Sequence, residues 1–169
     1  MILTPHALAG AATAVILRKH PFIAIVAAFL SHFILDAIPH WVYKLNSVKK
    51  DHSKPFGWDF IFGKGLVKDF FKTGFDFSIG LAIALGISGM FFPNYFWLTF
   101  FGAAAGVLPD FLTLVYYLFP DSPLSYLYWF HIKIHTREHL DSGSLLGFGY
   151  QIIFSLAITV IMVLVRPLF

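Results

Sequence analysis

Long apolar segments alternate with short polar ones along the chain, and their lengths predict helices that cross a membrane. A spanning helix needs about 20 mostly apolar residues, in a range of about 17–25. Apolar segments near or within this range occupy residues 4–17, 21–38, 75–92, 95–119 and 145–165. We therefore expect an all-α fold, a polytopic membrane helix bundle with about five transmembrane helices. Residues 1–169 should form a single integral-membrane domain.

Composition supports this expectation and limits the chemistry. Of the residues, 58% are hydrophobic and only 12% are charged, whereas soluble domains average about 25% charged. The chain has eight histidines and no cysteine, so any bound metal must be held by histidine, aspartate or glutamate side chains.

The segment between the second and third apolar stretches has a different pattern. Lys64, Lys68 and Lys72 repeat every four residues, and apolar side chains fill the opposite side of a helix over residues 58–71. This pattern predicts an interfacial amphipathic helix whose lysines face lipid phosphates. The alternative is an ordinary segment re-entering the membrane, with lysines that extend toward the interface.

The segment from Ser31 to Trp41 contains the first candidate site. His32 and Asp36 are four residues apart, so on a helix they share one face. Pro39 cannot continue the helix, and the turn there lets His40 fold back over the same face. The three side chains are a plausible ligand set for a metal. The alternative is a helix end with incidental polar residues, but an ionisable group in a membrane segment is a functional candidate by default.

A second histidine series, His131, His135 and His139, precedes the last apolar segment. Neighbouring members can share one ion on a helix, but the outer two would be about 12 Å apart, and Zn–N bonds are about 2.0–2.1 Å. The series therefore predicts two ions, or one histidine that serves the substrate or supports a ligand. The alternative is a histidine stripe that contacts lipid headgroups.

Topology places these residues together. If five spans alternate in direction, the starts of odd spans and the ends of even spans lie on one side of the membrane. His6, Asp76 and Asp110 fall on that side with both histidine groups. Asp110 and Asp76 are candidate general bases, although either could instead cap a helix. Lys64, Lys68 and Lys72 are candidates for holding a phosphate. The predicted metal ligands are His6, His32, Asp36, His40, His131, His135 and His139.

Two resemblances follow from these motifs. His32, Asp36, Pro39 and His40 are similar to the His-x3-Asp…Pro-x-His signature of zinc-dependent phospholipase C and P1 nuclease, although here the proline directly precedes the last histidine. Over nearly its full length the chain resembles the bacterial and archaeal family of inner-membrane, predicted metal-dependent hydrolases, some of them LexA-regulated. That resemblance is carried by His6 and Gly10, the core from Ser31 to His40, Leu108-Pro109-Asp110 and the histidine-rich connection.

We therefore expect an enzyme: a membrane-embedded, metal-dependent hydrolase that uses Zn²⁺ or another divalent metal. Its substrate should be a phosphate ester of a lipid or lipid-like molecule, and no nucleic-acid partner is expected. The alternatives are a non-enzymatic metal- or proton-handling membrane protein and a structural membrane protein.

The inner, cytoplasmic membrane is the expected location, with the site on the cytoplasmic face. Cytoplasmic loops carry the excess of Lys and Arg. The basic residues on the site side are Lys44, Lys49, Lys50, Lys54, Lys64, Lys68, Lys72, Lys133 and Arg137, against Arg18, Lys19 and Arg166 on the other side.

Overall fold

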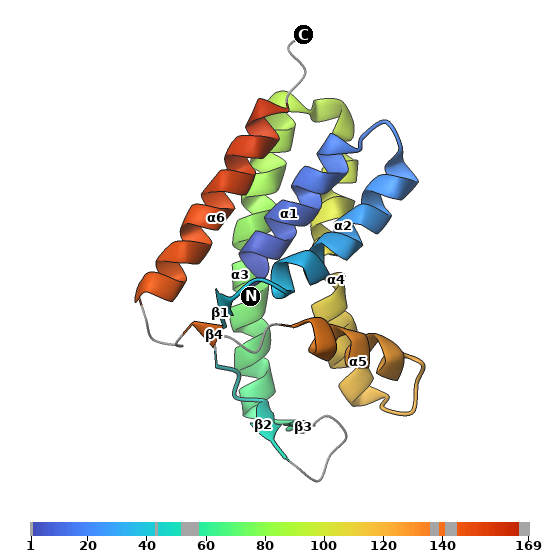
Figure 1. The fold of residues 1–169 in the computed structure, drawn as a ribbon, viewed down its shortest axis with the longest axis vertical. Coiled ribbons are helices and arrows are strands. Elements are labelled where there is room, and N and C mark those ends of the chain that lie inside the picture. Colours follow the sequence, from blue (N-terminus) through green and yellow to red (C-terminus); the bar gives the residue numbers. More distant parts are fainter. Residues whose placement is uncertain (1, 43, 52–57, 136–138, 141–144, 166–169) are drawn as a thin grey trace.

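Helices make up most of the computed structural model, which describes residues 2–42, 44–51, 58–135, 139–140 and 145–165 (Figure 1). The α-helices are α1 (Leu3–Ile16), α2 (Pro21–Asp36), α3 (Lys64–Phe91), α4 (Phe96–Leu118), α5 (Leu124–Ile134) and α6 (Leu145–Leu164). A 3-10 turn, η2 (Pro93–Tyr95), joins α3 to α4. The strands are β1 (His40–Trp41), β2 (Val48–Lys50), β3 (Trp58–Phe60) and β4 (His139–Leu140).

Helices α1 and α2 form the antiparallel hairpin that the sequence predicts (Figure 1). Pro21 is the first residue of α2, a position that suits proline because the first helical N–H has no partner within the helix. The helix ends at Asp36, shortly before Pro39 stops any continuation. His32 and Asp36 therefore lie in its last turns, and His40 follows directly in β1.

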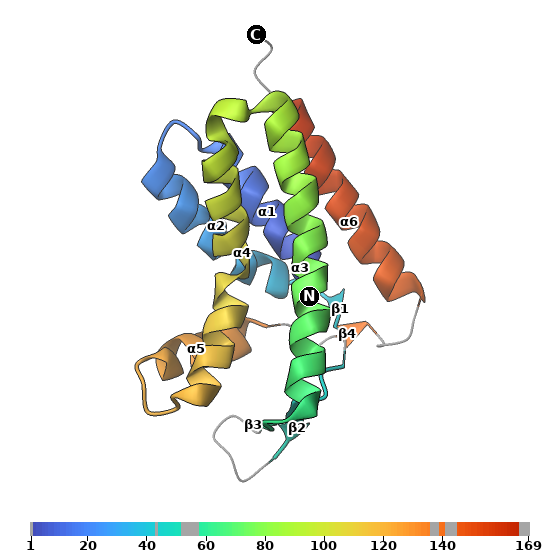
Figure 2. The same cartoon turned by 180° about the vertical axis from the view of Figure 1, so that it is seen from behind.

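Helix α1 lies at the centre of the bundle and packs against α2, α3, α4 and α6 (Figures 1 and 2). Its side chains from Thr4 to Ala12 are buried, and most of them are small. Small residues let helix backbones approach closely, which is how helices associate in lipid. The composition of α1 thus explains why four other helices surround it.

The tightest contact in the bundle is between α1 and α4. A Cβ atom added to Gly106 would collide with the carbonyl oxygen of His6, and one added to Gly10 would meet the backbone of Gly102 and Gly106. These glycines are needed for lack of space rather than for backbone conformation. Because these glycines have no side chain, the start of α1, which carries His6, can pack directly against the middle of α4.

Within the described residues, three helical segments have the length and apolar composition of membrane spans: Lys64–Phe91, Pro93–Leu118 and Gly147–Leu164. They indicate a membrane protein. The expected first two spans, α1 and α2, are apolar but have only 14 and 16 residues. At 1.5 Å per residue, 14 residues extend about 21 Å, less than the roughly 30 Å hydrocarbon core. The structure therefore supports three spans of full length, not five.

The expected separate amphipathic helix over residues 58–71 is wrong. Trp58–Phe60 is strand β3, which pairs antiparallel with β2, and Lys64 begins a single helix that continues to Phe91. The chain between residues 64 and 91 contains no proline that could end the helix. The lysine-bearing turns are consequently the first turns of α3.

The connection before α6 also differs from the expected regular histidine helix. Helix α5 ends at Ile134, so His135 follows its last turn. Strand β4 then pairs in parallel with β1, with His139 opposite His40. This pairing ties the start of the last helical segment to the end of α2. One residue from each histidine group, His40 and His139, is thereby held opposite the other by backbone pairing.

Candidate metal centre

Seven side chains, all imidazoles or carboxylates, meet where α1 begins and α2 ends. Four helices carry five of them, and the other two lie just after a helix. We refer to all seven as the His/Asp cluster. Helix α1 contributes one, α2 two, β1 one, α4 one, and α5 with the residue after it two. The members are His6, His32, Asp36, His40, Asp110, His131 and His135.

Asp36 lies at the centre of the cluster and is 1% exposed. Its Oδ2 atom is 2.7 Å from Nε2 of His131 and 3.0 Å from Nε2 of His32. Its Oδ1 atom is 3.2 Å from Nε2 of His6, 3.8 Å from that of His135 and 4.0 Å from that of His40. The two oxygens of one carboxylate therefore face two different groups of imidazoles.

The first group comprises His32, Asp36, Asp110 and His131. Asp110 Oδ1 is 3.6 Å from Nε2 of His32 and 3.7 Å from that of His131, and the two Nε2 atoms are 3.2 Å apart. Five of the six donor separations in this group therefore lie between 2.7 and 3.7 Å. A tetrahedral ion with bonds of about 2.0–2.1 Å has ligand separations of about 3.3 Å. The four donor atoms fit such an ion.

The second group comprises Asp36, His40 and His135. The rings of His40 and His135 are 4.8 Å apart between centroids, and Asp36 belongs to both groups. A carboxylate that faces two donor sets is the arrangement of a two-metal site, in which the ions are about 3.5–4 Å apart. The cluster has the donors for one ion and a partial set for a second.

Hydrogen bonds to the far side of each ring determine which nitrogen faces the cluster. Nδ1 of His32 lies 2.8 Å from the carbonyl oxygen of Gly106, and Nδ1 of His40 lies 2.6 Å from that of Ile38. A carbonyl only accepts, so both Nδ1 atoms carry the proton. We assign these tautomers from their partners. Fixing the outer N–H in this way is typical of metal-binding histidines.

His131 is oriented by the hydroxyl of Thr113. The hydroxyl donates to the carbonyl of Pro109 at 3.1 Å, which leaves its oxygen to accept from Nδ1–H of His131, also at 3.1 Å. In the neutral ring Nε2 of His131 is then unprotonated as well. Thr113 was not predicted from the sequence, where only its place one turn after Asp110 on α4 could have suggested it.

The assigned tautomers direct unprotonated nitrogens at carboxylate oxygens. Such contacts between acceptors repel unless a proton or a cation lies between them. Protonating His131 would satisfy its contact with Asp36, but His32 would still face the same carboxylate with a lone pair. A divalent cation can bind the lone pairs of all these nitrogen and oxygen atoms at once, so the residues present fit a metal.

Two further histidines add to this fit. Neither ring nitrogen of the fully buried His6 makes a hydrogen bond to the described part of the chain, although Nε2 is near Asp36. An unsatisfied buried imidazole is costly unless something else binds it. Burial lowers the pKa of His40 to about 3, so this imidazole is neutral at ordinary pH, as a metal ligand must be.

The structure places Asp76 and the three predicted lysines outside the cluster. Asp76 accepts hydrogen bonds from the backbone N–H of Leu3 and the hydroxyl of Thr4, so it caps the start of α1. Lys64, Lys68 and Lys72 are exposed on α3. The side chain of His139 is outside the described part of the structure, although its backbone pairs with β1.

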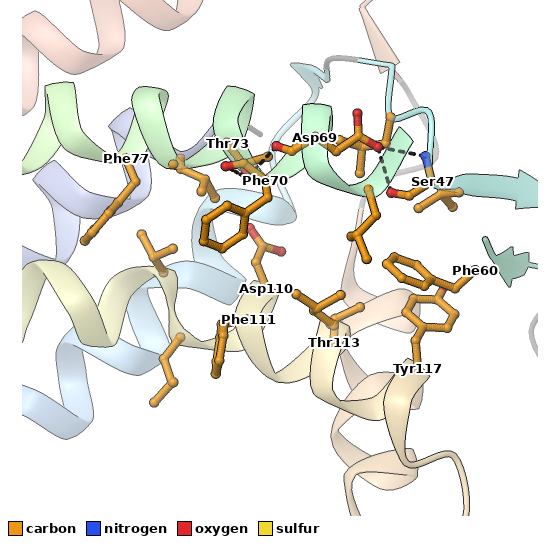
Figure 3. A pocket seen from close by; sticks show the side chains of 18 of the residues that line it. Ser47, Phe60, Asp69, Phe70, Thr73, Phe77, Asp110, Phe111, Thr113 and Tyr117 are labelled. Atoms are coloured by element: carbon orange, nitrogen blue, oxygen red, sulfur yellow. Dashed lines mark hydrogen bonds between the residues drawn. The ribbon is translucent and has the colours of Figure 1, made fainter. Parts of the chain in front are cut away.

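A pocket of about 560 Å³ lies between α3 and α4, beside the cluster (Figure 3). Asp110, Thr113 and His135 line it, whereas the three lysines do not. Most of the other lining side chains are apolar or aromatic. Of the first donor group only Asp110 faces this pocket, and its side chain is 36% exposed.

A buried aspartate that the sequence did not single out shapes one end of the pocket. Asp69 of α3 accepts hydrogen bonds from Asn46 and from the backbone and hydroxyl of Ser47, at 2.7–2.8 Å. It therefore fixes the chain before β2 against α3 (Figure 3). Its partners lie more than twenty residues away in sequence, beyond the reach of helical spacing.

Comparison of the chain with protein-family models, with curated proteins and with solved structures gives no match.

Proposed function

We propose that this protein is a membrane-embedded, metal-dependent hydrolase of phosphate esters, of the kind found in the inner-membrane hydrolase family that its motifs resemble. One observation carries the proposal. Four donor atoms, from His32, Asp36, Asp110 and His131, have separations suited to a tetrahedral ion, and one of the four residues, Asp110, lines a pocket. Catalytic zinc sites have three protein ligands and a fourth position that is open to water or substrate.

The donor set suits zinc, because imidazole nitrogens and carboxylate oxygens are both common zinc ligands. His32, Asp36 and His131 would hold the ion, and Asp110, the member of the group that lines the pocket, would lie beside it. His40 and His135, with the other oxygen of Asp36, are the donors for a second ion. A divalent ion bound there supplies a Lewis acid, which polarises a phosphoryl oxygen and acidifies a water molecule.

Asp110 is the group best placed to move a proton. It is the member of the first donor group that borders the pocket, and its partial exposure gives water access. In the proposed hydrolysis the oxygen of a water molecule bonds to phosphorus while Asp110 accepts its proton. The bond from phosphorus to the ester oxygen breaks, and that oxygen keeps the electron pair and takes up the proton that Asp110 accepted, leaving as an alcohol, while the hydroxyl of the water stays on the phosphate.

The structure changes which residues we assign to catalysis and substrate binding. Asp76 is engaged in capping α1, so we assign the role of base to Asp110. The exposed lysines of α3 do not border the pocket, so we no longer assign them to the phosphate; they suit lipid headgroups at the membrane surface. The substrate's organic part should be apolar, because the pocket beside Asp110 is lined mostly by apolar side chains.

We further propose that the protein resides in the inner membrane with the cluster at the cytoplasmic face. The described basic residues follow the expected distribution. Lys49, Lys64 and Lys133 lie toward the end of the molecule that carries β2, β3 and α5, while Arg18 and Lys19 follow α1 at the opposite end (Figure 1).

The activity is tested with purified, zinc-loaded protein and a short phosphate monoester, phenyl phosphate, by measuring the release of inorganic phosphate. Asp110→Asn should lower turnover by about 100-fold or more, as expected for loss of a general base. The control is Asp121→Asn, a change at an exposed turn residue, which should leave turnover unchanged. Equal phosphate release by Asp110→Asn and wild type would refute the assignment.

A further inference from the structure

The pocket between α3 and α4 joins a metal-binding geometry to an apolar surface. Its polar end includes Asp110, Thr113 and His135, which belong to the cluster or orient it. Most of the remaining lining is apolar and includes Phe77, Val107 and Leu114, while Asp69 and Ser47, which also line the pocket, are hydrogen-bonded to each other. The volume of about 560 Å³ lies within the 300–1,000 Å³ typical of small-molecule sites. This shape suits a molecule with one charged end and one hydrocarbon end.

The mouth of the pocket is apolar as well. Phe70 and Phe111 line the pocket and are nevertheless 62% and 56% exposed, so they border its opening. Both lie on helices with the length and composition of membrane spans, with Phe70 in the lysine-bearing first turns of α3, which we assign to the membrane surface. In Figure 3 the carboxylate of Asp110 is seen between Phe70 of α3 and Phe111 of α4. The opening therefore leads from the lipid side toward the cluster.

We propose that this pocket binds the hydrocarbon chain of an amphiphilic phosphate ester, which arrives from the membrane between Phe70 and Phe111 and places its phosphate beside Asp110 and His135. The proposal rests on the proposed function, because a phosphate beside the Asp110 carboxylate is repelled unless a cation is bound. It goes further by naming the substrate class, a phosphate on a long chain, and its route.

A separate groove, lined only by apolar residues, serves as an internal control for this proposal. It lies between α2 and α4 and is lined by Phe22, Ile25, Leu98 and Phe101, among others, all of them apolar. A hydrocarbon chain alone could occupy either hollow. Only the pocket between α3 and α4 offers polar partners for a phosphate, so the phosphate should decide which hollow is occupied.

The test is photolabelling of zinc-loaded, full-length protein in lipid nanodiscs with hexadecyl phosphate that carries a diazirine in its chain. Labelled peptides should map to residues 66–77 and 107–117, which contain most of the pocket lining. The same chain ending in an alcohol should label these peptides about tenfold less, because it lacks the charged contact. Metal-free protein should also label weakly with the phosphate probe.

A pair of glycine variants on α3 tests the location. An added Cβ at Gly74 or at Gly86 meets nothing within 4 Å, but only Gly74 lines the pocket. Gly74→Leu should fill the pocket and lower labelling about fivefold or more. Gly86→Leu adds the same side chain elsewhere on the helix and should label like wild type. Equal labelling of both variants, or labelling centred on the groove between α2 and α4, would overturn the proposal.

Phosphate release from unmodified hexadecyl phosphate and from phenyl phosphate separates this inference from the proposed activity. Phosphate-dependent labelling of the pocket without release from either ester would leave the binding proposal standing and refute the hydrolase. Release from phenyl phosphate with labelling outside the pocket would leave the hydrolase standing and refute the binding proposal.

Discussion

Thr113 should control the metal affinity of the cluster although it is not a ligand. Its hydroxyl accepts a hydrogen bond from Nδ1–H of His131 and donates one to the Pro109 carbonyl, both at 3.1 Å. Thr113→Val keeps the shape of the side chain and removes both bonds. His131 can then rotate or take the other tautomer, which points a proton at Asp36.

The size of this effect follows from the role of such outer contacts. Removing a group that orients a metal ligand typically costs 10–100-fold in affinity, or about 1.4–2.7 kcal/mol. The buried Thr99, on the same helix, is a matched control. Its hydroxyl also donates to the carbonyl four residues earlier, at 3.0 Å, but its other partner is Ser88, away from the cluster.

Zinc affinity is measured by competition with a chromophoric chelator, using detergent-purified protein. We expect Thr113→Val to bind zinc 10–100-fold more weakly, Thr99→Val to bind like wild type, and Thr113→Ser to recover most of the affinity. If Thr113→Val and Thr99→Val bind zinc with the same affinity as wild type, the orientation argument for His131 is wrong.

Three other changes test separate parts of the structure. Asp76→Asn should keep the bound metal but lower thermal stability by about 1 kcal/mol, because it weakens the cap of α1; loss of zinc in this variant would contradict the capping role. Gly106→Ala should destabilise by about 1–3 kcal/mol through overpacking against His6, whereas Gly89→Ala, with open space around it, should not; equal thermal shifts would refute the close packing. A cysteine replacing the exposed Lys49 should resist an impermeant thiol reagent on intact cells, and efficient labelling would reverse the orientation.

Much of the candidate site could be predicted from the sequence because it depends on helix geometry and on chain direction. The spacing of His32 and Asp36, the break at Pro39 and the alternation of helices placed His6, Asp110 and the second histidine group at one end of the bundle. The structure brings His6, Asp110, His131 and His135 together around His32 and Asp36. Only the order of the helices decides which end each residue occupies, so the shortness of α1 and α2 does not change this placement.

Several of the errors and omissions share a physical cause, because they depend on a partner distant in sequence. Asp76 looked like a residue of the site, but its partners are Leu3 and Thr4, more than seventy positions earlier. Thr113 became visible only when α5 brought His131 beside it. The strands could not be predicted either, because β1 and β4 are short and pair across almost one hundred residues.

The metal content of the purified protein tests the central claim most directly. Elemental analysis should compare wild type with a double variant, His32→Ala and Asp36→Ala, which removes two donors of the first group. A control double variant, His20→Ala and Asp121→Ala, changes the same residue types at exposed positions. We predict about one or more zinc equivalents in wild type and in the control, since three protein ligands, here His32, Asp36 and His131, hold a catalytic zinc ion, and almost none in the cluster variant. Equal metal content in all three proteins would contradict a metal centre formed by the His/Asp cluster.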